Sequence, residues 1–285
     1  MAMSSPAACC PDDSLPELSE PSCGRGAEMT ISAEVPLDIY VTSSPSNAKS
    51  AIIIASDVFG WQSGHHRRFA DQLAGKVGQE ATVVIPDLFH GSPLAQPMFA
   101  KRIGFQPFAF LLGLPSMLYR MFSRDIPNEV DRDLGVLVRY LRAAGVERLS
   151  IVGFCFGAWV VARALASEAN HEFACGIGVH PSLQLEKLLV KGSTDVELAK
   201  RVGATPFLLM PAAGDHANLK PGGEVCKVLA AARGVADAEV SHPFESMKHG
   251  WVTRGDDTAD AEIARDQSKA LERAAEFIMQ HASAS

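Results

Sequence analysis

Apolar residues gather in short continuous runs along most of the chain, and segments with helical spacing separate these runs. Runs rich in β-branched side chains stand at 51–55, 82–85 and 149–152. Continuous apolar runs of this length are typical of parallel strands that are buried on both faces. Alternating apolar and polar residues at 37–41 predict an earlier strand. The pattern therefore predicts a sheet whose central strands are covered on both sides.

The second half of the chain continues this alternation of apolar runs and helical segments. We expect further strands at 175–179, at 206–212 and beginning at 238–240. Leucine, valine and alanine at helical spacing predict helices between the strands, and we expect these helices at 65–77, 127–144, 156–168, 223–232 and 258–281. Strands that alternate with helices indicate an α/β fold, with a mostly parallel sheet and helices on both faces.

Two stretches depart from this alternation. Residues 1–33 are rich in serine, proline and acidic side chains, so we expect an extended or disordered N-terminal segment. A single α/β domain is expected over 34–285, with a helical insert at about 92–125 that is rich in phenylalanine and leucine. Such an insert either packs over the sheet as short helices or forms a lid or pocket wall near the strand ends.

Composition and charge narrow the class of protein. A hydrophobic content of 47% and a charged content of 21% are ordinary for a soluble globular protein. The net charge of −7 leaves no basic stripe for phosphates, so no nucleic-acid partner is expected. No run of 18 apolar residues is present, so no membrane partner is expected. The sequence leaves open a monomer or a homodimer.

Cysteine usage and the N-terminus bear on the compartment. Six cysteines in 285 residues do not suggest a disulfide framework. The first residues lack the basic start and apolar core of a signal peptide, and acidic side chains argue against a transit peptide. We therefore expect a reducing, cytoplasmic location.

The most informative motif is Gly-Phe-Cys-Phe-Gly at 153–157, which follows the 149–152 strand and opens the next helix. This strand–turn–helix arrangement places a nucleophile on a strained, exposed corner of a hydrolase sheet, here with Cys155 where serine usually stands. Glycine is needed on both sides because backbone approaches backbone in the turn. The helix N-terminus also favours a thiolate. Taken alone, the pattern also fits a small buried cysteine.

Chain order strengthens the catalytic interpretation. In this arrangement an acid and then a histidine follow the nucleophile. Asp215 comes just after the 206–212 strand, and His249 follows the strand expected from 238. Singly, Asp215 also fits a turn residue and His249 a loop residue. Together, at successive strand ends, they predict a Cys155–His249–Asp215 triad.

These motifs, taken in order, resemble the dienelactone hydrolase family of α/β-hydrolases, also called carboxymethylenebutenolidases. The matching pieces are Ser-Asp-Val-Phe-Gly at 56–60, Ile-Pro-Asp-Leu-Phe at 85–89, the motif around Cys155, Gly214-Asp215, and His-Gly-Trp at 249–251 with Arg254 beyond. The resemblance covers roughly residues 35 to 280. It implies a hydrolase of ester or lactone bonds that opens a lactone ring to a keto acid such as maleylacetate, without a metal or organic cofactor.

The resemblance also implies roles for further residues. The backbone N–H groups of Val58 and Phe156 are expected to form the oxyanion hole. Asp57 stands where the family has a glutamate that pairs with the resting thiol, and one methylene is missing here. The alternative for Asp57 is a turn residue before Val-Phe-Gly. Arg254 is the candidate for binding a substrate carboxylate, with Trp251 beside it.

Two questions remain open in the sequence. His180 follows a strand end, where it either lines the pocket or is a structural histidine. The substrate is expected to be a small-molecule ester or lactone, anionic if Arg254 binds a carboxylate. Alternative functions are a thioesterase or another carboxylic-ester hydrolase on the same scaffold. A non-enzymatic redox-sensing or binding module that uses Cys155 is a further alternative.

Overall fold

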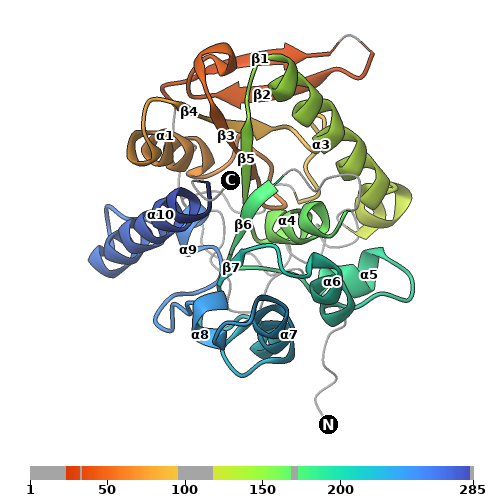
Figure 1. The fold of residues 1–285 in the computed structure, drawn as a ribbon, viewed down its shortest axis with the longest axis vertical. Coiled ribbons are helices and arrows are strands. Elements are labelled where there is room, and N and C mark those ends of the chain that lie inside the picture. Colours follow the sequence, from red (N-terminus) through yellow and green to blue (C-terminus); the bar gives the residue numbers. More distant parts are fainter. Residues whose placement is uncertain (1–23, 33, 96–117, 168–172, 283–285) are drawn as a thin grey trace.

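A computed structural model describes residues 24–32, 34–95, 118–167 and 173–282. Seven strands form one sheet in the order β1-β2-β4-β3-β5-β6-β7 (Figure 1). Their bounds are β1 (Ala27–Ile31), β2 (Leu37–Val41), β3 (Ser50–Ala55), β4 (Ala81–Pro86), β5 (Arg148–Phe154), β6 (Phe173–Val179) and β7 (Phe207–Met210). The five strands from β4 to β7 pair in parallel, and β1 and β2 join them antiparallel at one edge. The predicted α/β fold with a mostly parallel sheet is confirmed.

Helices cover both faces of this sheet. Figure 1 shows α1 and α10 on one face and α3, α4 and α6 on the other. Besides a helical stretch at 118–123, the helices of the described segments are α1 (His66–Val77), α3 (Ile126–Ala143), α4 (Phe156–Ala166), α5 (Leu185–Leu189), α6 (Asp195–Val202), α7 (Glu224–Arg233), α8 (Asp237–Val240), α9 (Trp251–Arg254) and α10 (Ala261–Ala282), with 3₁₀ turns η1 (Pro45–Asn47) and η3 (Ala217–Leu219).

The continuous apolar runs have a direct structural explanation. Successive side chains of β3 alternate between the two faces, and both faces are buried. Ile52 and Ile54 pack into the core beneath α1 and α10, whereas Ile53 and Ala55 pack into the core beneath α3 and α4. Every residue of the 51–55 run is therefore apolar, as the sequence pattern predicts.

One predicted strand is wrong. Residues 238–240 lie in the short helix α8, and only isolated parallel bridges, at Ser241 and Phe244, follow β7. Acidic side chains favour a helix start here, because the Glu239 carboxylate accepts from the Ala236 N–H. Beyond it, Pro243 has no N–H to offer a ladder. The segment still runs beside β7, because the N–H groups of His242 and Phe244 donate to Leu209 and Pro211.

The sheet begins earlier than the expected boundary at residue 33. Strand β1 lies inside the segment 1–33 and pairs with β2 in register from Ala27↔Val41 to Ile31↔Leu37. The hydroxyl of Tyr40 on β2 supports this hairpin, since it accepts from the Gly26 N–H and donates to Asp71 on α1. The extended character predicted for this part of the segment thus takes the form of an edge strand.

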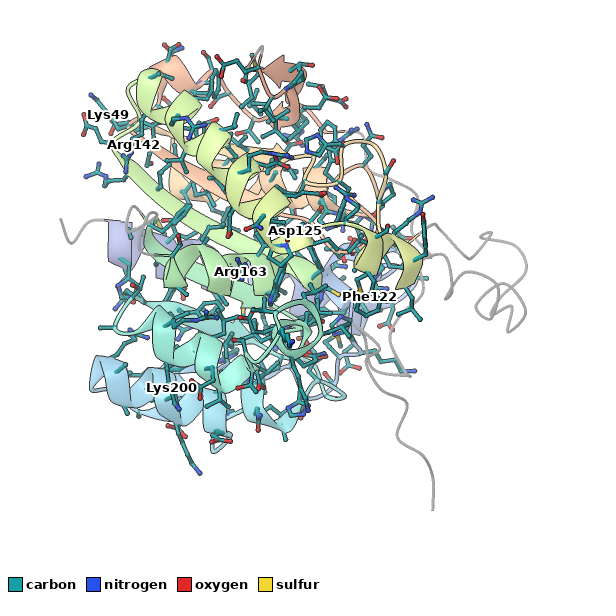
Figure 2. The ribbon with its side chains drawn as sticks, turned by 90° about the vertical axis from the view of Figure 1, so that its right-hand side faces the viewer. Lys49, Phe122, Asp125, Arg142, Arg163 and Lys200 are labelled. Carbon is teal, nitrogen blue, oxygen red and sulfur yellow. The ribbon has the colours of Figure 1, made fainter. Side chains whose placement is uncertain are left out.

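Most of the predicted insert, from 96 to 117, lies outside the described residues. Its described end, at 118–123, is helical and presents Tyr119 and Phe122 to solvent, with exposed fractions of 73% and 59%. Figure 2 shows Phe122 at the margin of the molecule, beyond the start of α3 near Asp125. Within the described ranges, no helix combines the length and the apolar character needed to cross a membrane.

Candidate active site

Cys155 occupies the sharp turn between β5 and α4 that the sequence predicts. Its backbone angles are φ 54° and ψ −113°, a conformation that non-glycine residues rarely adopt. The Cys155 N–H donates to the Val179 carbonyl at 3.1 Å, and its own carbonyl accepts from Ala158 and Ser182. Strain of this kind persists where the surroundings fix the backbone, and it is concentrated at functional sites.

The two glycines of the motif are required by close backbone packing. A Cβ at Gly153 would overlap the carbonyl oxygen of Gly157, and a Cβ at Gly157 would overlap the carbonyl oxygen of Ala55. The start of α4 therefore lies directly against the ends of β3 and β5. This contact sets the position of Cys155 at the carboxyl edge of the sheet.

His249 and Asp215 form a buried pair. The Nδ1 atom of His249 lies 2.6 Å from Oδ1 of Asp215, and the other carboxylate oxygen accepts from the Ala212 N–H at 2.8 Å. His249 has an exposed fraction of 0% and Asp215 of 6%. Because the carboxylate is an acceptor, the imidazole proton belongs on Nδ1, which leaves Nε2 as the basic nitrogen.

The end of β6 joins this pair to the cysteine. The N–H of Ser182 donates to the Cys155 carbonyl, and its hydroxyl lies 3.5 Å from the Cys155 sulfur. Two residues earlier, the ring of His180 lies 4.9 Å from the ring of His249. The three predicted triad residues are thus connected through one short segment, 179–182, at the carboxyl end of the sheet.

His180 is fully buried and has the unusual φ of 37°. Besides His249, its ring packs against Trp251 at 5.3 Å and against Phe154 at 5.8 Å. Trp251 is itself buried and packs on Phe244. His180 therefore supports His249 from its side, and Trp251, expected to bind substrate, packs behind His180, which fits the structural alternative for His180.

Asp57 organises the turn after β3. One oxygen of its carboxylate accepts from the Phe59 N–H at 3.0 Å, and the other accepts from the Thr253 hydroxyl at 3.1 Å. The Asp57 N–H donates to Nε2 of His66, whose Nδ1 faces the Ser63 carbonyl. These bonds fix the orientation of the His66 ring and the backbone of the turn. The geometry favours the turn-residue interpretation of Asp57.

Arg254 lies close to the same carboxylate. Its guanidinium lies 5.1 Å over the ring of Phe59, and its Nε is 3.9 Å from Oδ2 of Asp57. The residue has an exposed fraction of only 2%. A carboxylate of a substrate would therefore share this cation with Asp57.

The two predicted oxyanion donors are on elements that meet at the cysteine. Phe156 is the first residue of α4, and the first N–H groups of a helix have no partner within it. Val58 lies in the turn fixed by Asp57, and its carbonyl accepts from the Ala95 N–H at 3.0 Å. The Phe156 ring packs between Phe89 and Trp159.

Two residues near the site were not found from the sequence. Ser182 and His66 carry no local motif, since their contacts depend on how separate segments meet. The Pro-Ser that follows His180 was the only available signal for Ser182. Residues 65–68 read His-His-Arg-Arg, and nothing in this sequence distinguishes His66 from its neighbours before the fold is known.

The other cysteines of the described segments lie in different surroundings. Cys175 and Cys226 are buried free thiols, and burial raises the pKa of each to about 11. A thiol with such a pKa is almost fully protonated at neutral pH and reacts slowly. Cys155 differs from both because it stands at a helix N-terminus within the same cluster as a histidine–carboxylate pair.

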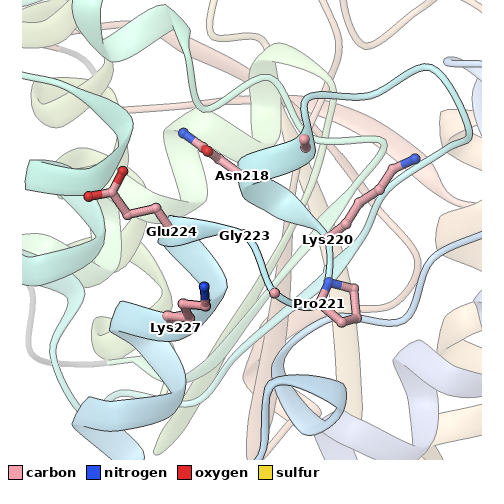
Figure 3. Close-up of a pocket in the computed structure, with 8 residues that line it drawn as sticks. Asn218, Lys220, Pro221, Gly223, Glu224 and Lys227 are labelled. Carbon is pink, nitrogen blue, oxygen red and sulfur yellow. The ribbon is translucent and has the colours of Figure 1, made fainter.

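A separate open pocket is lined by residues between positions 217 and 227 and has a volume of about 740 Å³. Figure 3 shows its charged rim, with Lys220, Glu224 and Lys227 around the turn at Gly223. None of the residues predicted for the active site lines it. Its charges of both signs and its open shape identify no ligand, so we assign the chemistry to the cluster around Cys155.

Comparison with known proteins adds an independent observation. The model of a family described as the dienelactone hydrolase family matches residues 37–282. A Rattus norvegicus protein named carboxymethylenebutenolidase homolog is 31% identical over 158 residues, which are 55% of this chain and 56% of that protein. Its Homo sapiens namesake is 27% identical over 174 residues, or 61% and 59% of the two chains. The match thus spans somewhat more than half the length of these relatives.

Solved structures share the architecture at low sequence identity. An esterase from Pyrobaculum calidifontis superposes with a TM-score of 0.55 at 13% identity, covering 91% of this chain and 84% of that one. The Pyrococcus furiosus esterase Pf2001 gives a TM-score of 0.55 at 13% identity, with coverage of 95% and 98%. These likenesses show the α/β-hydrolase fold.

Proposed function

The chain belongs to the dienelactone hydrolase family, and from this premise we propose that it hydrolyses carboxylic ester or lactone bonds with Cys155 as nucleophile. The observation that carries the proposal is the strained turn at Cys155 beside the buried His249–Asp215 pair. A nucleophile on such a turn, followed in the chain by an acid and a histidine, is the arrangement of α/β-hydrolase catalysis. The substrate class is a small-molecule ester or lactone.

The proposed reaction begins with transfer of the Cys155 thiol proton to Nε2 of His249. The thiolate attacks the carbonyl carbon, a C–S bond forms, and the carbonyl π electrons move to oxygen. The N–H groups of Phe156 and Val58 stabilise this oxyanion, and such donors are worth about 3 kcal/mol each. Asp215 holds the imidazole through the 2.6 Å bond and stabilises its charged form.

The second half-reaction consumes water. Collapse of the tetrahedral intermediate expels the alkoxide, which takes the proton from His249 and leaves a thioester on Cys155. His249 then removes a proton from water, and the resulting hydroxide attacks the thioester carbon. The acid product leaves and the thiol is restored. For a lactone, the alcohol and the acid are parts of one product, so the ring opens.

The chemistry has consequences for the compartment. A thiol nucleophile and the buried free thiols of Cys175 and Cys226 are compatible with a reducing environment. We therefore propose the cytoplasm as the place where the enzyme acts.

Turnover tests the proposal directly. Purified protein is assayed with a dienelactone and with p-nitrophenyl acetate, beside Cys155→Ala and a control variant, Cys226→Ala. Cys226 is also buried but lies on α7. We expect Cys155→Ala to lose more than about a thousandfold in kcat/KM, with Cys226→Ala close to wild type. Turnover of Cys155→Ala near the wild-type rate contradicts the proposal.

A further inference from the structure

The side chain of Ser182 is a hydrogen-bond partner of the predicted nucleophile. Its hydroxyl oxygen lies 3.5 Å from Sγ of Cys155, within hydrogen-bond distance for sulfur, and both residues are fully buried. The two residues are 27 positions apart in the sequence and meet because β6 lies next to β5. A buried hydroxyl in contact with a reacting sulfur has a chemical consequence whichever group is the donor at rest.

The backbone holds this hydroxyl in place. The Ser182 N–H donates to the Cys155 carbonyl at 3.2 Å, and the Cys155 N–H donates to the Val179 carbonyl at 3.1 Å. The Ser182 carbonyl in turn accepts from the Leu185 N–H. The main chain at 182 is therefore tied to the strained turn on one side and to the start of α5 on the other. The Cα of Ser182 is thus held beside the turn that carries Cys155.

The electrostatic need for such a donor follows from burial. A thiolate that is shielded from water is costly unless donors replace its hydration. The carboxylate oxygens of Asp57, in the turn after β3, accept from the Phe59 N–H and the Thr253 hydroxyl, so they offer no donor. Ser182 places an O–H group on the sulfur from the opposite side of the turn, at the end of β6.

A second cysteine–serine pair in the same sheet has the same spacing, with the Cys175 thiol as the donor at rest. Sγ of Cys175 lies 3.5 Å from the hydroxyl of Ser150, and this bond lowers the pKa of Cys175 against the larger rise caused by burial. The Cys155 site adds a helix N-terminus and a basic imidazole, which the Cys175 site lacks.

We propose that Ser182 is a catalytic hydrogen-bond donor that stabilises the thiolate of Cys155 once the thiol proton has moved to His249. This inference rests on the proposed function. In the step it assists, the S–H bond breaks, its proton moves to Nε2 of His249, and the Ser182 O–H donates to the electron pair left on sulfur. That pair then forms the C–S bond. Ser182 therefore lowers the pH at which the Cys155 thiolate forms. Its effect on the limiting rate is smaller.

Other titratable and charged groups lie around the turn that carries Cys155. None of these residues is substituted in the experiment. The titratable and charged side chains on the elements packed around this turn include the His249–Asp215 pair, His180 at the end of β6, Asp57 after β3 with His66 of α1 and Arg254 of α9, Asp87 and His90 after β4, and Arg163 of α4 with Glu186 of α5.

The experiment measures the thiol itself. Wild type, Ser182→Ala and Ser182→Thr are alkylated with iodoacetamide from about pH 5 to 10, and modification of the Cys155 peptide is followed by mass spectrometry. A hydrogen bond to a charged group is worth roughly one pKa unit. We expect the midpoint of Cys155 alkylation to rise by about one unit in Ser182→Ala, and Ser182→Thr to stay near wild type because it keeps the hydroxyl.

A matched variant separates this effect from general damage to the core. Ser150→Ala removes the equivalent hydroxyl from Cys175 and is expected to leave the Cys155 midpoint unchanged. Should Ser182→Ala fail to fold, the pair Ser182→Thr and Ser182→Val offers the same comparison, since the two side chains have similar volume and only the first has a hydroxyl. A Cys155 midpoint that is equal with and without the hydroxyl overturns the inference.

The readout is independent of turnover. If Cys155 shows the shift while no ester or lactone is hydrolysed, the proposed function fails and the Ser182 contact stands. If hydrolysis depends on Cys155 but the midpoint does not move, the function stands and the role of Ser182 is wrong. In active protein, the acid limb of kcat/KM is expected to move with the alkylation midpoint.

Discussion

The indole N–H of Trp159 donates to Oε2 of Glu186 at 2.8 Å, and this carboxylate on α5 is fully buried. Its other oxygen accepts from the hydroxyl of Ser193 and from Arg201 on α6. Trp159 stands one turn after Cys155 on α4, with its ring against Phe156. Arg163, on the same helix, reaches from α4 toward Asp131 of α3 (Figure 2). The Glu186 carboxylate thus links α4, the helix that follows Cys155, to α5 and α6.

Glu186→Ala should therefore destabilise the protein strongly. It leaves the Trp159 N–H and a partly buried arginine without their acceptor, and such losses cost about 2 to 3 kcal/mol. Urea unfolding measures the change. The matched control is Glu197→Ala, which removes an exposed pair with Lys200 on α6. Its unfolding free energy should equal that of wild type, and an equal loss in both variants would show that Glu186 has no special role.

Two glycine substitutions should have opposite effects on the stability of the protein. Gly153→Ala places a Cβ on the Gly157 carbonyl, so α4 must shift away from β5. Overpacking of this kind costs about 1 to 3 kcal/mol. Gly75 lies within α1 with open space around its Cα, and Gly75→Ala is expected to stabilise by about 0.5 to 1 kcal/mol. Thermal unfolding of both variants checks the pair, and an unchanged melting temperature for Gly153→Ala would contradict the packing argument.

The histidine at the start of α1 should make stability depend on pH. Burial, and then the charge of Arg68, lower the pKa of His65 below its usual value. The unfolded chain therefore takes up a proton near pH 6.5 while the folded chain still holds His65 neutral. Proton uptake by the unfolded state favours unfolding. This contribution to stability is complete above about pH 6.5 and is lost as the pH falls toward the folded pKa.

Urea unfolding of wild type and His65→Gln between about pH 8 and pH 5.5 measures this contribution. Glutamine can still donate to the Gly255 carbonyl, which lies 3.0 Å from Nε2 of His65. The variant should lose less stability on acidification than wild type. Part of the slope should remain, because burial also lowers the pKa of His242. Identical slopes would assign the pH dependence to other groups.

Much of this arrangement was accessible from the sequence, for identifiable reasons. The buried strands can be predicted from the sequence because both faces of β3 and β5 are apolar. The turn at Cys155 is visible because only glycine fits at 153 and 157. Cys155 and Asp215 lie near each other because a parallel sheet brings the carboxyl ends of β5 and β7 to one edge, whereas His249 follows a segment with only isolated bridges to β7.

What the sequence did not reveal depends on contacts between separate segments. Ser182 reaches Cys155 only because β5 and β6 are neighbours, and Glu186 has partners on α4, on α6 and in the loop between α5 and α6. The segment at 238–240 was expected to begin a strand, yet Glu239 accepts from the Ala236 N–H and completes a helix start there. Asp57 has the same chemistry as a longer glutamate, but its oxygens are taken by Phe59 and Thr253. Local sequence patterns do not predict contacts of this kind between distant segments.

The charge near Asp57 leads to a prediction about substrate choice. If Arg254 binds a substrate carboxylate, Arg254→Gln should lower the ratio of kcat/KM for an anionic lactone to that for a neutral ester by about tenfold, the worth of a charge-assisted hydrogen bond. The ratio cancels any general loss caused by leaving Asp57 without its neighbouring cation. An unchanged ratio would mean that Arg254 serves only the cluster with Asp57 and Phe59.

The most direct test of the central claim is to trap the covalent intermediate. The protein is mixed with p-nitrophenyl acetate, quenched in acid within the first turnover and digested, and the acylated peptide is identified by mass spectrometry. We expect one acetyl group, on the peptide that carries Cys155, and no acetylated peptide in Cys155→Ala. An acyl group on another residue, or hydrolysis with no acylated Cys155 at any time, would contradict the central claim.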